Sequence, residues 1–541
     1  MRPPSELLLP DGTPSRWWQH GVIYQVYPLS FADSNGDGSG DLRGIVARLG
    51  HLRWLGVDAV WISPIYPSPM ADFGYDVSDY CDVDPRFGSL ADFDALTSEA
   101  HRLDLRVILD FIPNHTSDQH PWFVQSRSSR HHPKRDWYLW RDPAPLGGPP
   151  NNWLAEFGGP AWQLDPSTGQ YYQHSFLKEQ PDLNWRNPEV QSAMLDVLRF
   201  WLNRGVDGFR VDAIHHLFKD AEFRDNPPNP KFRPGMLPRR QLIRQYTTDL
   251  PEVQDAARAM RAALGPSLDR VLIGEAYLPL PRLVAYYGDQ LDAFHLPFNF
   301  HLIETHWDAT ALAAMIAEYE ACLPPGAWPN WVLGNHDRSR IASRVGPAQA
   351  RVAAVLLCTL RGTPTLYYGD EIGMRDVPIA ADQVRDPFEK NVPGMGLGRD
   401  PERTPMQWSP APHAGFSTAP PWLPLAPDFR GVNVETQSHD PASMLWLYRS
   451  LLAKRREQPA LSIGSYEALE VPPPLLGYVR AHGSERIVAL LNLSAAPQPL
   501  VVPGVLASDP ILLSTHPGRS GNPLGPELLA DEAVLVSSSS R

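Results

Sequence analysis

The segment GVDGFRVDA, residues 205–213, places an arginine and an aspartate two residues apart in a stretch rich in β-branched side chains. Residues 206–212 have the length of a strand, and residues two apart on a strand share one face. Arg210 and Asp212 are therefore expected to point the same way. In a closed site the arginine would lower the pKa of the aspartate and fix its orientation, as a charged nucleophile requires. A structural ion pair at a strand end is the alternative.

Three further segments carry polar clusters directly after apolar stretches. They are DFIPNH (residues 110–115), GEA (residues 274–276) and NHD (residues 335–337). Asp212, Glu275 and Asp337 follow one another at intervals of 63 and 62 residues. Because this interval suits two strand-helix units, the three carboxylates are expected to meet at one rim of a parallel barrel.

Paired carboxyl groups, one ionised and one protonated, are the apparatus of glycoside hydrolysis. The acid protonates the leaving oxygen while the carboxylate forms a glycosyl-enzyme, and a third carboxylate can hold sugar hydroxyls and raise the pKa of the acid. A hydrolase metal site is the competing interpretation, because Asp, Glu and His also bind metals. Against it, the paired histidines, His131-His132 and His215-His216, are adjacent in sequence, and adjacent side chains diverge on a regular strand or helix.

Continuous apolar strands alternate with helices along most of the chain, which is typical of a parallel sheet covered on both faces. The expected strands are 21–31, 57–64, 106–112, 206–212, 270–276, 292–300, 330–335 and 363–369. The expected helices are 41–55, 89–103 with Ser89 as its cap, 188–204, 252–264, 309–323, 347–361 and 441–458. Eight strands predict an α/β fold of the (β/α)8 TIM barrel type.

Two interruptions of this alternation predict additional domains. Residues 116–186 are rich in Trp, Tyr, Pro, Gly and Asn and indicate a subdomain inserted after strand 3. From residue 462 the pattern changes to short alternating apolar runs, such as 477–481 and 486–493, which predict a C-terminal antiparallel β domain. The expected division is barrel 1–115, subdomain 116–186, barrel 187–461 and β domain 462–541. The last five residues, SSSSR, are expected to be disordered.

The composition limits the environment and the partners. A net charge of -13 disfavours nucleic acid or an acidic membrane surface as partner. Cys81, Cys322 and Cys358 are too few and too scattered for a disulfide framework and are expected to be buried free thiols. The N-terminus lacks the apolar core of a signal peptide, and no stretch is long enough for a membrane helix. These features predict a cytoplasmic protein and leave its oligomeric state open.

The ordered set DFIPNH, QPDLNW (residues 180–185), GFRVDA, GEA and NHD resembles the α-amylase superfamily, glycoside hydrolase family 13. GYDVSDY (residues 74–80) and GRDPERTPMQW (residues 398–408) are similar to its α-glucosidase and oligo-1,6-glucosidase branch. The resemblance implies that Asp212 is the nucleophile, Glu275 the general acid/base and Asp337 the transition-state stabiliser.

The resemblance also implies a set of substrate-binding residues. Arg210 would orient Asp212, and His115 and His336 would contact the sugar. Asp76 and Arg399 would close the non-reducing end of the pocket as a pair, with a salt bridge between loops as the alternative. Aromatic pocket positions of the family are matched by Tyr75, Phe157 and Phe176, although most aromatics at such positions are simply core.

The segment from Asp33 to Asp41 places oxygen ligands at every second residue, separated by glycines, as calcium requires. It is not an EF-hand, because the twelfth position is Gly44 and a strand precedes the loop. Family relatives hold one structural Ca²⁺ in the corresponding loop, here through Asp33, Asn35, Asp37, Asp41 and the Ser39 carbonyl. An Asx-turn loop without an ion is the alternative.

The expected function is an exo-acting, retaining α-glucosidase that releases glucose from short oligosaccharides. Ala213, directly after the nucleophile, resembles relatives that favour α-1,4 bonds. The alternative enzyme is an α-glucosyl transferase or a sugar isomerase similar to trehalose synthase, which uses the same triad. A non-catalytic relative, such as the amylase-like subunit of amino-acid transporters, is disfavoured by the intact triad and the missing membrane helix.

Overall fold

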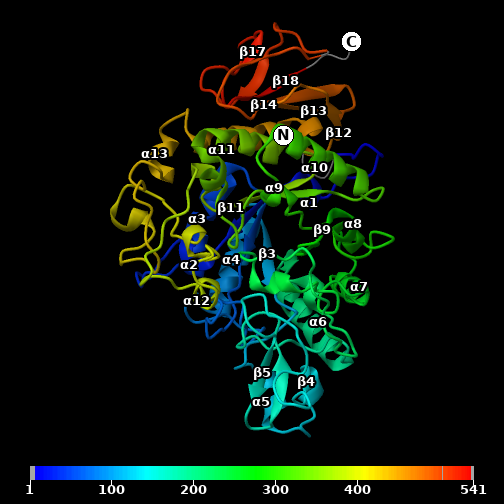
Figure 1. Ribbon diagram of the computed structural model, residues 1–541. Coiled ribbons are helices and arrows are strands. Elements are labelled where there is room, and N and C mark those ends of the chain that lie inside the picture. Colours follow the sequence, from blue (N-terminus) through cyan, green and yellow to red (C-terminus); the bar gives the residue numbers. More distant parts are fainter. Residues whose placement is uncertain (1–6, 503, 538–541) are drawn as a thin grey trace.

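A parallel sheet of eight strands rolls into a nearly closed barrel at the centre of the computed structural model, which describes residues 7–502 and 504–537 (Figure 1). The expected barrel fold is confirmed. Its strands are β1 (Ile23–Val26), β2 (Ala59–Ile62), β3 (Arg106–Phe111), β7 (Gly208–Val211), β8 (Val271–Gly274), β9 (Leu296–Pro297), β10 (Asn330–Val332) and β11 (Thr363–Tyr367).

Backbone pairing runs in the order β10-β11-β1-β2-β3-β7-β8-β9, so the first strand pairs with the last in the chain. Side chains complete the ring between β9 and β10. The Asn330 amide donates to the Pro297 carbonyl, and the Asn299 N–H donates to Asn330 Oδ1 at 3.1 Å. These contacts replace part of the missing backbone ladder and keep the strand ends on a common rim.

All eight strands are shorter than expected, and two of them lose more than half of their expected length. The strand expected at 21–31 ends at Val26, because Pro28 begins a short helix, α2 (Pro28–Phe31), and proline suits the first turn of a helix. The strand expected at 292–300 is reduced to the two residues of β9.

The helices expected around the barrel are present, with ends shifted by a few residues. Ser89 caps α4 through a capping box with Asp92, as expected. Helix α11 begins six residues before the expected start and bends at Gly346.

The longer helices are α3 (Leu42–Leu55), α4 (Leu90–Arg102), α5 (Pro121–Ser128), α6 (Pro188–Asn203), α7 (Val253–Ala263), α10 (Ala309–Cys322), α11 (Ile341–Thr359) and α14 (Met444–Glu457). The short ones besides α2 are α1 (Trp17–His20), α8 (Leu280–Leu283), α9 (His301–Glu304), α12 (Pro387–Asn391), α13 (Val434–Ser438) and α15 (Pro459–Ser462).

Smaller antiparallel sheets lie at opposite ends of the molecule (Figure 1). The sheet between β3 and α6 has the order β4-β6-β5 and consists of β4 (Trp140–Arg141), β5 (Trp162–Asp165) and β6 (Gln170–Gln173). The C-terminal sheet has the order β12-β13-β14-β18-β16 and consists of β12 (Ser465–Leu469), β13 (Leu475–His482), β14 (Glu485–Asn492), β16 (Ile511–Ser514) and β18 (Ala533–Ser537). A separate pair joins β15 (Gln498–Pro499) to β17 (Glu527–Leu528). The residue boundaries of the expected domains stay predictions.

The C-terminal sheet is fixed to the barrel through α11. The hydroxyls of Thr359 and Tyr478 share a hydrogen bond of 2.6 Å, and the Gln349 amide donates to Asp531 Oδ1 at 2.6 Å. Side chains from both parts belong to one apolar core. The sheet is therefore an integral support of the barrel wall.

Other expectations from composition have mixed outcomes. No helix in the described part of the chain is long and apolar enough to cross a membrane. The three cysteines are free, but only Cys358 is fully buried, whereas Cys81 and Cys322 are half-buried. Of the five terminal residues expected to be disordered, Ser537 ends β18, and the other four lie outside the described residues.

Candidate active site

Arg210 is fully buried and gathers three carboxylates at the ends of β3, β7 and β8. One terminal nitrogen donates to Asp110 Oδ1 at 2.6 Å and to Asp212 Oδ1 at 2.8 Å, while the other lies 2.7 Å from Glu275 Oε2. Arg210 and Asp212 do point the same way, as the strand period predicts. The structure also brings Glu275 to the same guanidinium, so the expected nucleophile and acid lie side by side.

The expected lowering of the Asp212 pKa is wrong. Burial raises the pKa of Asp212 well above its usual range, and the negative charges of Glu275 and Asp110 raise it further. The positive charge of Arg210 lowers this pKa but offsets only part of the increase. Burial also raises the pKa of Asp110, to about 6. Three carboxylates with one guanidinium carry excess negative charge, which favours retention of a proton in the cluster. Because the carboxylates share this proton, it can move to the one that acts as general acid when another acts as nucleophile.

Glu275 occupies its place because the preceding residue is a glycine. A Cβ atom on Gly274 would lie 2.8 Å from the Phe294 ring, which is closer than a side chain tolerates. Glu275 Oε2 accepts a hydrogen bond of 2.9 Å from the N–H of Ala213. Ala213 has a φ of 45° in the left-handed region, so the chain turns sharply after the nucleophile and aims this N–H at the acid.

Asp337 follows β10 and is held by two arginines. Its Oδ1 accepts from Arg399 at 3.1 Å and from Arg403 at 2.8 Å. Burial opposes ionisation, but His336, Arg399 and Arg403 outweigh it and keep the pKa of Asp337 well below its usual range. Asp337 is therefore ionised at neutral pH, in contrast to the proton-retaining group around Arg210.

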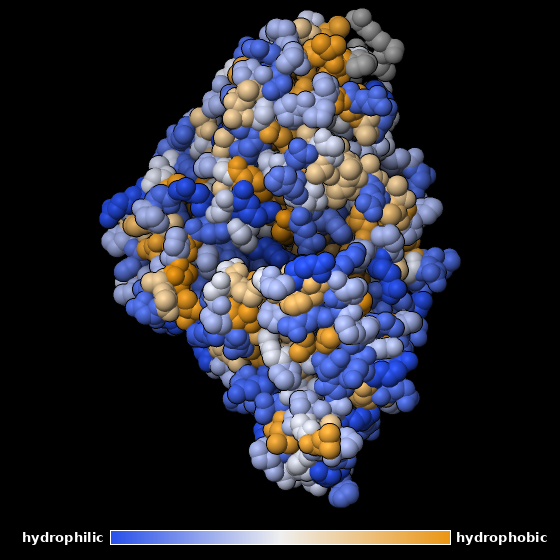
Figure 2. Space-filling view, viewed as in Figure 1, coloured by the Kyte–Doolittle hydropathy of each residue, from blue (hydrophilic) through white to orange (hydrophobic). Residues whose placement is uncertain are grey.

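A cavity of about 970 Å³ contains the three expected catalytic carboxylates. The surface is hollowed near the middle of the view in Figure 2, where hydrophilic side chains gather. The expected substrate-binding residues that line the cavity are Tyr75, His115, Phe157, Phe176, His336 and Arg399. Arg210 and Asp76 do not line it. Arg210 is thus a positioning residue behind the carboxylates.

The acidic partner of Arg399 is Asp72 and not Asp76, which corrects the expected pair. The Arg399 guanidinium donates to Asp72 Oδ1 at 2.6 Å. The Asp76 carboxylate is turned into its own loop, where it accepts from Ser68 Oγ and from the N–H groups of Ala71 and Asp72 at 2.8 to 2.9 Å. Asp76 therefore shapes the loop that presents Asp72.

Aromatic side chains form the wall beside the catalytic carboxylates. The Tyr75 ring stacks on His336 with centroids 5.2 Å apart, and its hydroxyl lies 2.6 Å from His336 Nε2. Phe176 packs 5.1 Å from the His115 ring, and Phe157 lies under the Arg399 guanidinium at 4.9 Å. Burial lowers the pKa of His115 to about 4, so this ring offers neutral hydrogen-bonding atoms. The wall thus combines apolar faces with neutral polar edges, which suits a sugar ring.

Sequence inspection missed several polar groups that support this site. Asp386 binds the Arg399 guanidinium at 2.7 Å, and Arg403 donates to the His336 carbonyl at 2.6 Å. Lys219 is buried between Asn114 and Asp182 and ties two of the motif segments together. Arg403 lies inside the GRDPERT segment, so its motif position was a usable signal. Asp386 lies outside every motif and had no such signal.

The loop from Asp33 to Asp41 turns its side-chain oxygens toward its own backbone. Asp33 accepts from the N–H groups of Asn35, Gly36 and Gly38 at 2.7 to 2.9 Å, and Asp41 caps α3 through the Gly44 N–H. Among residues 7–502 and 504–537, no three His, Cys, Asp or Glu side chains converge as metal ligands. The donor types suit Ca²⁺, and in this structure they bind the loop's own backbone.

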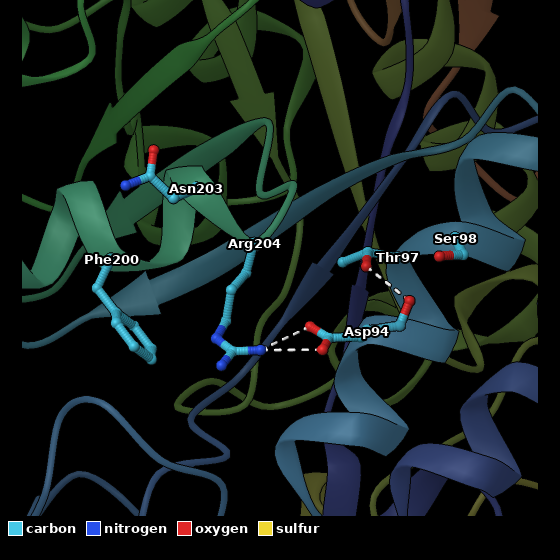
Figure 3. Close-up of a pocket in the computed structure, with 6 residues that line it drawn as sticks. All are labelled: Asp94, Thr97, Ser98, Phe200, Asn203 and Arg204. Atoms are coloured by element: carbon cyan, nitrogen blue, oxygen red, sulfur yellow. Dashed lines mark hydrogen bonds and ion pairs between the residues drawn. The ribbon is translucent and has the colours of Figure 1, made fainter.

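A second depression, of about 550 Å³, lies between α4 and α6 and shares no residue with the main cavity (Figure 3). Its charged groups are Asp94 and Arg204, whose guanidinium bonds both carboxylate oxygens at 2.9 Å. This surface pair satisfies itself, and the depression has none of the convergent unpaired groups of a catalytic site.

The comparisons with known proteins agree with this geometry. The family model for the α-amylase catalytic domain matches residues 25–464. A probable α-glucosidase of Rhizobium meliloti (strain 1021) is 46% identical over 91% of each chain, and an oligo-1,6-glucosidase of Parageobacillus thermoglucosidasius is 36% identical over 88% of this chain and 90% of its own. Among solved structures, an α-glucosyl transfer enzyme shares 41% identity with a TM-score of 0.91, covering 97% of this chain and 100% of its own. A trehalulose synthase variant shares 33% with a TM-score of 0.89 over the same proportions. The chain therefore belongs to the α-amylase family, in its α-glucosidase branch, and is a glycoside hydrolase.

Proposed function

We propose that the protein is an exo-acting, retaining α-glucosidase that removes glucose from the non-reducing end of short α-glucosides. One observation carries the proposal: a single cavity holds Asp212, Glu275 and Asp337, together with the buried Asp72–Arg399 pair. Charged groups that flank the triad supply hydrogen bonds for the hydroxyls of one terminal sugar. Short oligosaccharides with α-1,4 links of the maltose type are the expected substrates.

The reaction is a double displacement. Asp212 attacks the anomeric carbon, while Glu275 gives its proton to the oxygen of the leaving sugar, and a glucosyl-enzyme forms. Glu275 then takes a proton from water, which attacks the same carbon and releases glucose in the α-configuration. Ionised Asp337 holds hydroxyls of the glucosyl group. The shared contact of Asp212 and Glu275 with Arg210 favours the retaining separation of about 5 Å over the wider inverting one.

Selection for chain ends follows from the charged groups at the buried end of the cavity. The exposed fractions of Asp72 and Arg399 are 4% and 7%. A hydrogen bond from a charged group to a sugar hydroxyl contributes about 1.5 to 3 kcal/mol. An internal glucose unit lacks the free terminal hydroxyl and would leave these groups unpaired. The enzyme should therefore cut maltose and short maltodextrins and leave the interior of starch intact.

The test combines variants with the stereochemistry of the product. Asp212→Asn and Glu275→Gln should each lower turnover by several orders of magnitude with little change in melting temperature. Proton NMR of the early maltose reaction should show α-glucose first. β-Glucose as the first product would exclude the double displacement, and mixed oligosaccharides from starch would exclude exo action.

Transfer of the glucosyl group to a sugar is the second candidate function. The structural similarity to an α-glucosyl transfer enzyme and to a trehalulose synthase favours it, because such enzymes share the fold of this chain. Incubation with maltose, isomaltose, sucrose and trehalose, followed by chromatography, separates the two candidates. Glucose as the main product supports hydrolysis, whereas new disaccharides or longer sugars support transfer or isomerisation.

We further propose a cytoplasmic location and one structural Ca²⁺ in the loop from Asp33 to Asp41. Three free cysteines support the first proposal, because reducing compartments keep thiols unpaired. The alternation of oxygen-bearing residues and glycines supports the second. Binding would require Asp33 and its neighbours to exchange backbone hydrogen bonds for the ion, so the metal would act on stability and supply no catalytic group.

A further inference from the structure

The loop between β7 and α7 contains a strongly basic stretch. Residues 224–244 include six Lys or Arg and one acidic residue, in a chain whose net charge is -13. Four of these basic side chains line the cavity, namely Lys231, Arg239, Arg240 and Arg244. A local excess of one sign of charge along a cleft attracts ligands of the opposite sign.

Neighbouring acids do not cancel this charge. Glu156 is the acidic partner of both Arg239, at 2.9 Å, and Arg244. Lys231 and Arg240 form no ion pair within the described residues and are exposed. The four basic side chains of this loop and their ion-pair partner Glu156 together carry a formal charge of +3. The wall therefore differs from the acidic floor around Arg210.

Buried polar atoms without partners lie beside the same cations. His215 and His216 line the cavity, each with an exposed fraction of 4%. The Nδ1 atom of each ring has no hydrogen-bond partner within the described residues. Burial lowers the pKa of His215 to about 3, and the charge of Arg244 adds to the effect. A ligand that reached these rings and the arginines would satisfy atoms that the protein leaves unpaired.

Exposure shows which part of the substrate meets this wall. Asp72 and Arg399 are buried and bind the terminal glucose in the proposed function, whereas Lys231 and Arg240 line the same cavity and are exposed to solvent. The leaving group must extend toward solvent past the acid, Glu275. Resting on that function, we propose that the basic loop recognises a carboxylate or phosphate on the leaving group, so the enzyme prefers α-glucosides with an anionic aglycone.

A pair of aryl α-glucosides tests this preference. The 4-carboxyphenyl glucoside carries the anion, and the 4-carbamoylphenyl glucoside is its neutral counterpart of similar shape. The ratio of their kcat/KM values is measured for the parent and for the double variant Lys231→Gln/Arg240→Gln. Because both proteins act on the same two leaving groups, the intrinsic reactivities cancel when the ratios are compared. The ratio should fall about 3- to 10-fold in the variant, and in the parent it should decline as salt is added.

A matched control removes the same two kinds of charge elsewhere. The double variant Lys454→Gln/Arg199→Gln changes side chains on α14 and α6 that do not line the cavity, and it should keep the parent ratio. An unchanged ratio in Lys231→Gln/Arg240→Gln would overturn the inference, as would an equal fall in the control. Failure to hydrolyse the neutral glucoside would instead contradict the proposed function. Maltose with a phosphate on its reducing sugar then distinguishes phosphate from carboxylate recognition.

Discussion

Two buried arginines organise the acidic groups of the pocket. Arg210 holds Asp110, Asp212 and Glu275, and Arg399 binds three carboxylates in the same way, those of Asp72, Asp337 and Asp386. The outcomes differ because Asp337 has Arg403 as a second cation. The first group is short of positive charge and favours keeping a proton, whereas Asp337 stays ionised. One pocket thus provides both an acid and a permanent anion.

Asp72 and Asp76 should respond differently to removal of the carboxylate. Asp72→Ala should lower kcat/KM on maltose by about 10- to 100-fold with little change in melting temperature, whereas Arg399→Ala should lower both, because three carboxylates then lose this cation. Asp76→Ala leaves Ser68 Oγ and two loop N–H groups without an acceptor, so it should first lower the melting temperature by a few degrees. Kinetics and thermal melts on the three variants check this. If Asp76→Ala lost activity at an unchanged melting temperature while Asp72→Ala kept its activity, Asp76 and not Asp72 would be the sugar-binding carboxylate.

The pH profile should depend on Asp110. With three carboxylates around Arg210, kcat/KM should follow a bell whose alkaline limb reports loss of the retained proton. Asp110→Asn removes one negative charge, so the proton leaves more easily and the apparent pKa of the cluster falls. The alkaline limb should therefore move to lower pH by about one unit. Asp196→Asn, on the exposed face of α6, serves as the control. A limb that stays fixed or moves upward in Asp110→Asn would contradict the shared proton.

Short strands and tight turns decide where the functional groups lie. The barrel strands have two to six residues, and each catalytic carboxylate follows the last residues of a strand. In the loop from Asp33 to Asp41 one residue has two roles, because Asp41 both ends the loop and caps α3. Asp33 also accepts from Ser417 Oγ at 2.6 Å. The loop therefore joins the first strand-helix unit to a segment near the end of the barrel.

Calcium should stabilise the fold without changing the chemistry. If the loop binds the ion in the native state, adding Ca²⁺ to a chelated sample should raise the stability, by about 2.7 kcal/mol at a hundredfold excess over Kd. Asp37→Asn should weaken the effect, whereas Asp79→Asn, at a similar exposed turn outside the loop, should keep it. Calorimetry of the two variants with and without the ion provides the measurement. Equal melting temperatures with chelator and with Ca²⁺ in the parent would exclude the site.

Sequence patterns predicted the parts of this structure that depend on local periodicity. Strand alternation placed Arg210 and Asp212 on one face, and the capping pattern at Ser89 marked the start of α4. The Asp212 pKa was mispredicted because it depends on Asp110 and Glu275, which come from other strands. The expected pairing of Asp76 with Arg399 failed for a related reason, since turn geometry and not residue type decides which carboxylate leaves the loop. Such long-range and turn-dependent facts are not encoded in short motifs.

The residues that line the main cavity come from segments distributed over almost the whole barrel. The catalytic carboxylates come from β7, β8 and β10, the aromatic wall from the segments after β2 and β3, and Arg399 from the segment after β11. The C-terminal sheet supports α11 from outside. No half of the chain contains a complete site.

Arg399 lies 327 residues beyond Asp72 in the chain, and β1 finds one of its two partners in β11. On the ribosome, where synthesis adds about 5 to 20 residues per second, the first strand emerges many seconds before the strand that flanks it. The nascent chain must hold an open sheet edge during that delay, and such edges attract other strands. Pocket closure is therefore among the last events of biosynthesis, and the growing polypeptide remains inactive and in need of protection until nearly all of the barrel has been translated.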